Sequence, residues 1–213
     1  MIYKEKDLIE KTGLNLDQKS VDLLQKEKEV QLLSSLDIHE VAHLFTNPES
    51  YFFRSLSHLE LLKKMSTENI SIWFAGCSTG QEVYSASLML SSISDKTLVG
   101  TDLSRKYIEK ALSGSFFVFR QSEIKSLKKY EQLPQSQLYL NNNKKSLDVK
   151  FSSIKKEGIS FDIHNLMDGP YNSGFDIVYC RNVLLHMTIK GKKKALSSLK
   201  DGVKEGGILI LGD

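Results

Sequence analysis

The sequence predicts an α/β fold: a parallel sheet with helices on both faces, preceded by a small helical N-terminal domain. From about residue 46 onward, apolar runs alternate with segments of helical periodicity, a pattern typical of strand–helix–strand units. The first of these runs ends in a turn of small residues that leads directly into an apolar helix. Before that point, leucine and valine recur at helical spacing among charges. We therefore expect a helical N-terminal domain (1–45) and an α/β domain (46–213).

Apolar runs mark the strands that we expect to be buried in the sheet. They cover residues 70–76, 97–104, 159–166, 175–184 and 206–213. Right-handed connections in a doubly wound sheet would place them in the order 3-2-1-4-5. The segment 115–158 is polar and lacks strong periodicity, so we expect either an inserted subdomain or a mobile stretch there.

Composition excludes several classes of protein. The chain has 213 residues, of which 40% are hydrophobic and 26% charged, as in an ordinary globular protein. A net charge of +3, with scattered lysines, does not indicate a nucleic-acid partner. No apolar run reaches the roughly 18 residues of a membrane span, and the N-terminus lacks the apolar centre of a signal peptide, so we expect a cytoplasmic protein with no direct membrane insertion. Cys77 and Cys180 lack metal-ligand spacing, which predicts free thiols and no metal site.

The turn Gly76-x-Ser78-x-Gly80 is the first candidate for a binding site. Its small residues would let the backbone approach a ligand, and the N–H groups at the start of the following helix would point toward it. Asp102, at the end of the next strand, is placed to accept both hydroxyls of a ribose. Glu82, near the start of the helix, could bind the amino group of a sulfonium cofactor. The alternative is a tight structural turn with a structural aspartate.

Six segments resemble, in the same order, the signatures of the CheR-type chemotaxis receptor methyltransferases. They are SYFFR (50–54), WFAGCSTGQEVYS (73–85), GTDLS (100–104), ALSGSFF (111–117), HNL (164–166) and FDIVYCRNVLLH (175–186). The resemblance implies a Rossmann-like class I methyltransferase fold, with S-adenosylmethionine as cofactor and S-adenosylhomocysteine as product. It also implies methyl transfer to glutamate side chains on a cytoplasmic helix of a chemoreceptor or a related helical protein.

The resemblance further assigns roles to individual residues. Arg54 corresponds to the active-site arginine of the family. The implied cofactor contacts are Ser50, Gly76, Ser78 and Gly80 around the turn, Glu82 at the amino acid end, Asp102 at the ribose, Asn165 and Leu166 at the adenine, and Arg181 with Asn182 near the methionine carboxylate. Asn165 could instead form a turn, and Asn182 a helix cap. Phe52 and Phe53 are expected to pack in the core.

Two residues depart from the family pattern. Pro48 replaces a polar residue that often contacts the cofactor, which puts that contact in doubt. His186 stands where the family commonly has a tyrosine, and it is either a catalytic proton acceptor or a partly polar filler. The N-terminal region is also acidic, where receptor-modifying relatives present basic residues. Two alternatives therefore stay open: a cofactor-binding regulatory module without turnover, and a methyltransferase for another protein or small-molecule nucleophile.

The last predicted strand is apolar on both faces. Methyltransferases of this fold usually close the sheet beyond the fifth strand with an antiparallel hairpin, and the sequence has nothing after Asp213. An apolar edge strand favours pairing with another chain. We therefore expect either a dimer formed through residues 206–213 or a fragment that is less stable than a longer chain.

Overall fold

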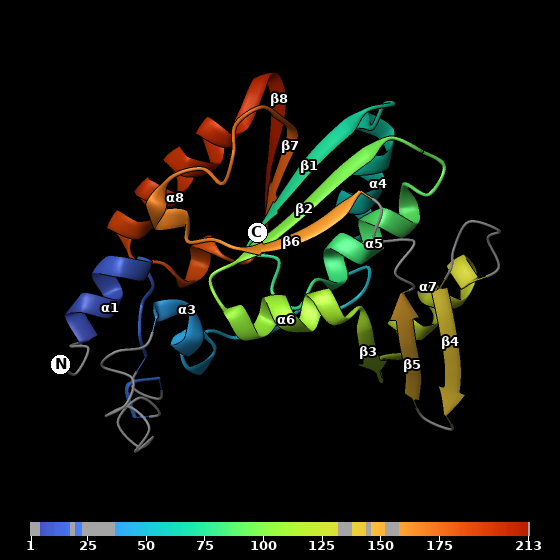
Figure 1. The fold of residues 1–213 in the computed structure, drawn as a ribbon, viewed down its shortest axis with the longest axis horizontal. Helices are drawn as coiled ribbons and strands as arrows, with labels where there is room; N and C mark the ends of the chain where they lie inside the picture. The colour runs from blue at the N-terminus through green and yellow to red at the C-terminus, as the bar shows by residue number, and fades with distance from the viewer. Residues whose placement is uncertain are drawn as a thin grey trace.

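The computed structural model describes residues 5–17, 20–22, 37–131, 138–143, 146–151 and 158–212. Its centre is a parallel sheet in the order β6-β2-β1-β7-β8 (Figure 1). The strands are β1 (Ile70–Ala75), β2 (Lys96–Asp102), β6 (Ile159–Ile163), β7 (Phe175–Cys180) and β8 (Val203–Leu211). The predicted strand order 3-2-1-4-5 is confirmed, because alternating strands and helices with right-handed connections leave few other arrangements.

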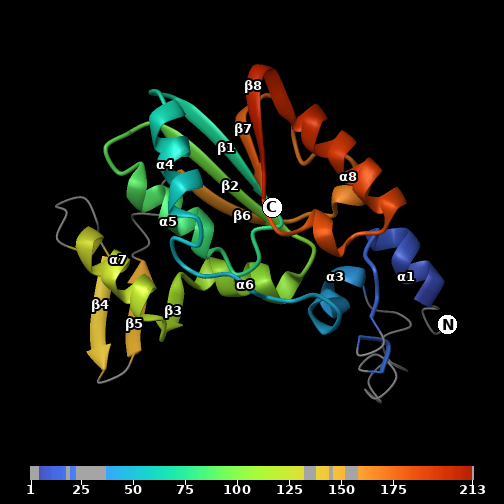
Figure 2. The same ribbon diagram turned by 180° about the vertical axis from the view of Figure 1, so that it is seen from behind.

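Helices cover both faces of this sheet (Figures 1 and 2). One face carries α8 (Ile189–Gly202), and the other carries α4 (Leu56–Met65), α5 (Gln81–Met89) and α6 (Arg105–Ser113). Side chains of β1 alternate between the two cores: Ile72 and Phe74 join one, and Trp73 and Ala75 the other. Burial on both faces explains why the strands read as continuous apolar runs.

The apolar runs predicted the strands but not their ends. β2, β6 and β7 stop at Asp102, Ile163 and Cys180, earlier than predicted, and the residues that follow form loops and the short helices η5 (Leu166–Asp168) and η6 (Leu184–His186). The last strand begins earlier than predicted, at Val203, with a register irregularity opposite β7. Apolar residues continue past the strand ends because the loops are also buried, so apolarity alone does not mark where a strand stops.

β8 lies at one edge of the sheet, and within the described residues it pairs only with β7. Ile208 and Leu211 on this strand are 36% and 38% exposed. A dimer through this edge stays a prediction.

N-terminal elements lie near one end of the sheet (Figure 1). They are α1 (Glu5–Thr12), α3 (Ile38–Val41) and η3 (Ala42–Leu44), and they bury Leu8 and Val41. The leucines and valine predicted to be helical between residues 23 and 36 lie outside the described residues. Directly after α1 the chain leaves the helix, and Leu14 forms an antiparallel β-bridge with Met187. The division between the two domains stays a prediction.

Part of the polar segment after α6 folds into a second, antiparallel sheet of order β3-β5-β4. Its elements are β3 (Ser115–Val118), α7 (Gln121–Glu131), β4 (Leu138–Asn143) and β5 (Ser146–Phe151). We call this unit the β-subdomain. Phe52 packs against the rings of Phe116 and Phe151 in it, at centroid distances of 5.1 and 6.0 Å. Phe53 stacks on Tyr130, so the predicted core role of both phenylalanines is confirmed.

Three further features bear on the class of protein. No helix in the described part of the chain combines the length and apolarity that crossing a membrane requires. The same residues contain no cluster of His, Cys, Asp and Glu arranged to hold a metal ion. Cys77 and Cys180 are buried and free, as predicted, and burial raises the pKa of Cys180 to about 12, so this thiol is protonated at neutral pH.

Candidate active site

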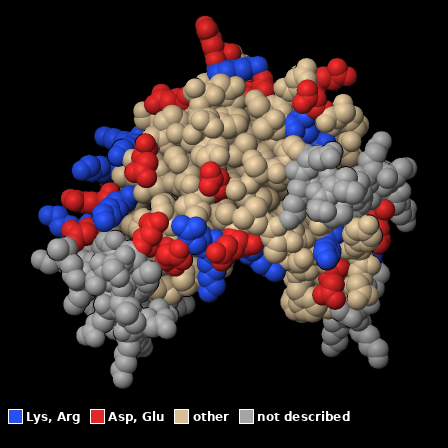
Figure 3. Space-filling model, in the orientation of Figure 1, with Lys and Arg blue, Asp and Glu red and all other residues tan. Residues whose placement is uncertain are grey.

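A cavity of about 950 Å³ opens beyond the carboxyl ends of β1, β2 and β7, where ligands bind in doubly wound sheets. Acidic and basic side chains mix along the lower edge of the molecule in the view of Figure 3. Every candidate site residue except Gly80 lines the cavity: Ser50, Arg54, Gly76, Ser78, Glu82, Asp102, Asn165, Leu166, Arg181, Asn182 and His186. The structure thus brings together residues from distant parts of the sequence.

The turn after β1 is held by backbone geometry that requires glycine. Gly76 has a φ of +73° and donates its N–H to the Thr101 carbonyl at 2.8 Å. A Cβ atom on Gly76 would lie 2.2 Å from Cγ2 of Val183, so the valine side chain or the backbone would have to shift. Gly80 has a φ of +90° at the start of α5, and a Cβ there would lie 2.9 Å from Cβ of Ala111. Gly80 therefore shapes the start of the helix, and it is not among the described residues that line the cavity.

Asp102 is fixed beside this turn. Its Oδ2 accepts the Ser78 N–H at 2.8 Å, and its Oδ1 accepts the Ser104 N–H at 3.0 Å. Burial raises the pKa of Asp102 above its ordinary value, while the N–H groups of Ser104, Ser78 and Leu103 oppose that rise. Each carboxylate oxygen can accept about two hydrogen bonds, so both keep capacity for a ligand hydroxyl.

Glu82 and Arg181 form a buried ion pair at the cavity wall. Arg181 Nη1 donates to Glu82 Oε1 at 2.9 Å, and the side chains are only 6% and 16% exposed respectively. The Tyr179 hydroxyl donates to the same oxygen at 3.1 Å. Burial lowers the pKa of Arg181, but Tyr179 and Glu82 raise it by more, so the guanidinium stays charged. One acid and one base side by side suit a ligand that carries an amino group and a carboxylate.

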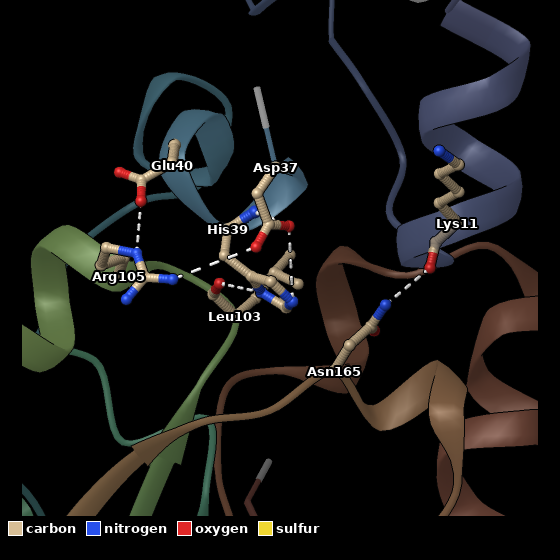
Figure 4. A network of polar contacts seen from close by, with 7 residues as sticks. All are labelled: Lys11, Asp37, His39, Glu40, Leu103, Arg105 and Asn165. Carbon is tan, nitrogen blue, oxygen red and sulfur yellow. Dashed lines mark hydrogen bonds and ion pairs between the residues drawn. The ribbon is translucent and has the colours of Figure 1, made fainter. Parts of the chain in front are cut away.

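Asn165 serves the protein's own backbone. Its Oδ1 accepts the Met167 N–H at 3.0 Å, and its Nδ2 donates to the Lys11 carbonyl at 2.8 Å (Figure 4). The turn-forming alternative is thus observed, while its amide still borders the cavity. Leu166 is 8% exposed and presents an apolar surface at the same wall.

Some buried polar atoms at the cavity wall lack hydrogen-bond partners. Among the described residues that line the cavity, these atoms are Ser50 Oγ, Ser78 Oγ, Arg181 Nε and Asn182 Oδ1. Buried polar groups are satisfied in most proteins, so such a group calls for a ligand or water. Asn182 has a φ of +56°, in the left-handed region that asparagine adopts more readily than most residues other than glycine. These atoms all belong to residues lining the cavity, which fits a polar ligand there.

Arg54 and His186 border the cavity in different ways. Arg54 Nη1 donates to the Glu49 carbonyl at 2.5 Å, and its guanidinium lies 5.3 Å from the centroid of the Tyr51 ring. His186 is exposed, and its backbone carbonyl accepts the Asn15 N–H at 2.7 Å. Both side chains can therefore meet a molecule that enters the cavity.

Most of the N-terminal wall of the cavity was not predicted from the sequence, which pointed there only to Pro48 and Ser50. Residues 14–17 line this wall, as do His43–Ser50 and Tyr107. Figure 4 shows how α3 is anchored there: the His39 ring donates from Nδ1 to the Leu103 carbonyl at 2.8 Å, and Arg105 pairs with Glu40. The Thr-Gly pair at residues 12 and 13 indicates a turn near this wall but not what the turn faces.

Residues 48–213 match a family model described as "CheR methyltransferase, SAM binding domain". The chain belongs to this family. Its sheet is therefore the Rossmann-like sheet of class I methyltransferases, and its cofactor is S-adenosylmethionine. The family match begins just before the SYFFR segment and includes every candidate site residue.

Individual relatives are similar at modest identity. A "Chemotaxis protein methyltransferase" of Listeria innocua is 28% identical over 189 residues, covering 84% of this chain and 69% of the relative. One of the same description from Borreliella burgdorferi is 28% identical over 216 residues, covering 90% and 71%. Among solved structures, a TehB-like SAM-dependent methyltransferase from Corynebacterium glutamicum is 15% identical with a TM-score of 0.46, covering 90% of this chain and 71% of that one.

The cavity fits the cofactor of this family. Its unpartnered polar atoms, the close-packed glycine turn and the acid–base pair at one wall suit a zwitterionic nucleoside ligand. Glu82, Arg181 and Asp102, the residues expected at the methionine end and the ribose, all line the cavity.

Proposed function

We propose that this chain transfers the methyl group of S-adenosylmethionine to glutamate side-chain carboxylates of a chemoreceptor or a related helical protein. The observation that carries the proposal is the family match over residues 48–213 together with a cavity lined by nearly all of the family's site residues. The relatives from Listeria innocua and Borreliella burgdorferi, both described as chemotaxis protein methyltransferases, support the chemotaxis context.

When bound, S-adenosylmethionine supplies an electrophilic methyl group on a sulfonium cation. Glu82 and Arg181 would bind and orient the methionine end, and Asp102 the ribose hydroxyls. Ser50, Ser78 and Asn182 would supply hydrogen bonds from atoms that have no partner among the described residues. Asn165 and Leu166 would form the wall at the adenine.

Arg54 would orient the acceptor carboxylate. A glutamate side chain has a reference pKa of about 4.3, so it is ionised at neutral pH and needs no general base. Correct alignment of reacting groups can supply roughly 7 to 11 kcal/mol of the barrier reduction. A strong ion pair to the acceptor would stabilise the ground state as well, so the arginine contributes mainly through orientation.

His186 keeps a second candidate function open. Its imidazole is exposed at the cavity, where it could accept a proton from a nucleophile other than a carboxylate. With such a nucleophile, His186→Phe should lose most of the activity, because the proton acceptor is removed. With a glutamate acceptor, which is already ionised at neutral pH, the same substitution should change activity little.

Transfer of radiolabelled methyl to receptor cytoplasmic fragments tests the proposal. Carboxyl methyl esters hydrolyse in mild base, whereas methyl groups on nitrogen or sulfur do not, so base-labile label supports a carboxylate acceptor. Base-stable label on the protein points instead to another nucleophile. Tight cofactor binding without any transfer would leave a regulatory module.

A further inference from the structure

A buried carboxylate of the β-subdomain reaches the segment that carries Arg54. Glu123 of α7 is 6% exposed, and its Oε2 accepts the Phe52 N–H at 2.7 Å. Neither residue lines the cavity. Glutamate is almost never buried unless it is paired, so the burial of Glu123 at this contact calls for a structural explanation.

The contact fixes an irregular turn. Phe53 has a φ of +55°, and its N–H donates to Ser85 Oγ at 3.0 Å. Two consecutive N–H groups are thus bound by side chains from α7 and α5, outside any regular helix or strand. Arg54 is the next residue, and it lines the cavity. The direction in which its side chain leaves the backbone therefore depends on these two contacts.

A second set of contacts links Arg120, the residue that precedes α7, to the side chain of Arg54. The Arg120 guanidinium lies 4.3 Å from the centroid of the Tyr51 ring, and Arg54 lies 5.3 Å from the same centroid. Arg120 also lies 4.0 Å from the Glu49 carboxylate and 3.8 Å from that of Glu123. Arg54 donates to the Glu49 backbone carbonyl, so the two arginines share both neighbours.

We propose that Glu123 is a positioning residue of the active site, which holds the 51–54 turn so that Arg54 meets the acceptor carboxylate in a fixed orientation. This inference rests on the proposed function, because it takes Arg54 to orient the acceptor. It assigns the β-subdomain a role in turnover through α7. Burial raises the pKa of Glu123, and the Phe52 N–H and Arg120 counter that rise, as expected for a carboxylate kept as an acceptor.

Glu123→Ala and Glu123→Gln in the full chain separate positioning from simple stability. The alanine variant leaves the buried Phe52 N–H without its acceptor, and we expect kcat for methyl transfer to fall about 100-fold while the Kd for S-adenosylhomocysteine changes less than about twofold. The glutamine variant keeps an acceptor oxygen, so kcat should return to within about fivefold of the wild type.

Asp176→Ala is the matched control. The Asp176 carboxylate also accepts a backbone N–H, that of Ser71 at 2.8 Å, but it lies at the opposite end of the sheet and does not line the cavity. We expect a comparable loss of stability with kcat nearly unchanged. An equal fall of kcat in Glu123→Ala and Asp176→Ala, or no fall in Glu123→Ala, would overturn the positioning role.

Hydrogen exchange of residues 50–56 gives a readout that does not need an acceptor. Exchange there should rise in Glu123→Ala and stay near the wild-type rate in Glu123→Gln. If the wild type transfers no methyl to carboxylates while the two variants differ in exchange as expected, the proposed function fails, but Glu123 still holds the 51–54 turn. If Glu123→Ala leaves exchange unchanged, Glu123 does not hold the turn.

Discussion

Replacing Glu82 by glutamine tests the buried ion pair at the cavity wall. The substitution keeps the shape of the side chain and removes the charge that faces Arg181 Nη1 at 2.9 Å. Because the Arg181 side chain is only 6% exposed, its charge would lose its buried partner. Breaking such a pair costs about 3 to 5 kcal/mol, and we expect the lower end because glutamine still accepts a hydrogen bond.

The same substitution should weaken cofactor binding. If Glu82 accepts hydrogen bonds from the amino group of the cofactor, its loss removes an interaction with a charged group worth about 1.5 to 3 kcal/mol. That range corresponds to a Kd roughly 10- to 100-fold higher. Isothermal titration with S-adenosylhomocysteine measures the affinity, and urea denaturation of the same samples measures the stability.

Asp176→Asn controls for stability in this experiment. Its carboxylate pairs with Lys204 and accepts the Ser71 N–H, far from the cavity. We expect it to lower stability without changing the Kd. A Kd for Glu82→Gln within twofold of the wild type, at the expected loss of stability, would contradict the assignment of Glu82 to the cofactor.

Three further predictions concern the turn, the acceptor and a half-buried histidine. Gly76→Ala should lower the free energy of unfolding by about 2 to 5 kcal/mol, because it places a side chain at a positive φ and a Cβ 2.2 Å from Val183. It should also raise the cofactor Kd in titrations, and an unchanged free energy of unfolding and Kd would refute the close contact. Arg54→Ala should lower methyl transfer about 100-fold in steady-state kinetics with little change in cofactor Kd, and equal loss of both would reassign Arg54 to the cofactor. Burial lowers the pKa of His164, and its hydrogen bond to the Gly169 carbonyl only partly offsets this shift. Because His164 therefore binds a proton more tightly in the unfolded chain, the free energy of unfolding falls as pH drops below about 6.5. His164→Gln should flatten that fall in urea denaturation between about pH 5 and 7, and an identical pH dependence in both proteins would argue against it.

The sequence predicted the sheet because its signals are local. Each strand is buried on both faces, so it reads as an apolar run, and the alternation with helices leaves few strand orders. The strand ends were less predictable. Leu166, for example, is buried in a short helix and not in a strand, and its apolarity reports burial without reporting backbone conformation.

Long-range polar contacts could not be predicted from the sequence. The hydrogen bond from Asn165 to the Lys11 carbonyl joins residues separated by 154 positions, and nothing in either segment indicates it. The same holds for Glu123 and Phe52, because a glutamate on an amphipathic helix normally indicates an exposed face. The glycine motif also does not separate a glycine that faces a ligand from one that packs on other residues, as Gly80 does on Ala111 and Phe161.

Mapping the transferred methyl group tests the central claim most directly. After incubation with S-adenosylmethionine and receptor cytoplasmic fragments, tandem mass spectrometry would locate the methylated atom. The account predicts a methyl ester on glutamate side chains, formed by the wild type and strongly reduced in Arg54→Ala. A methyl group on a nitrogen or sulfur atom, or esters formed equally well by Arg54→Ala, would contradict it.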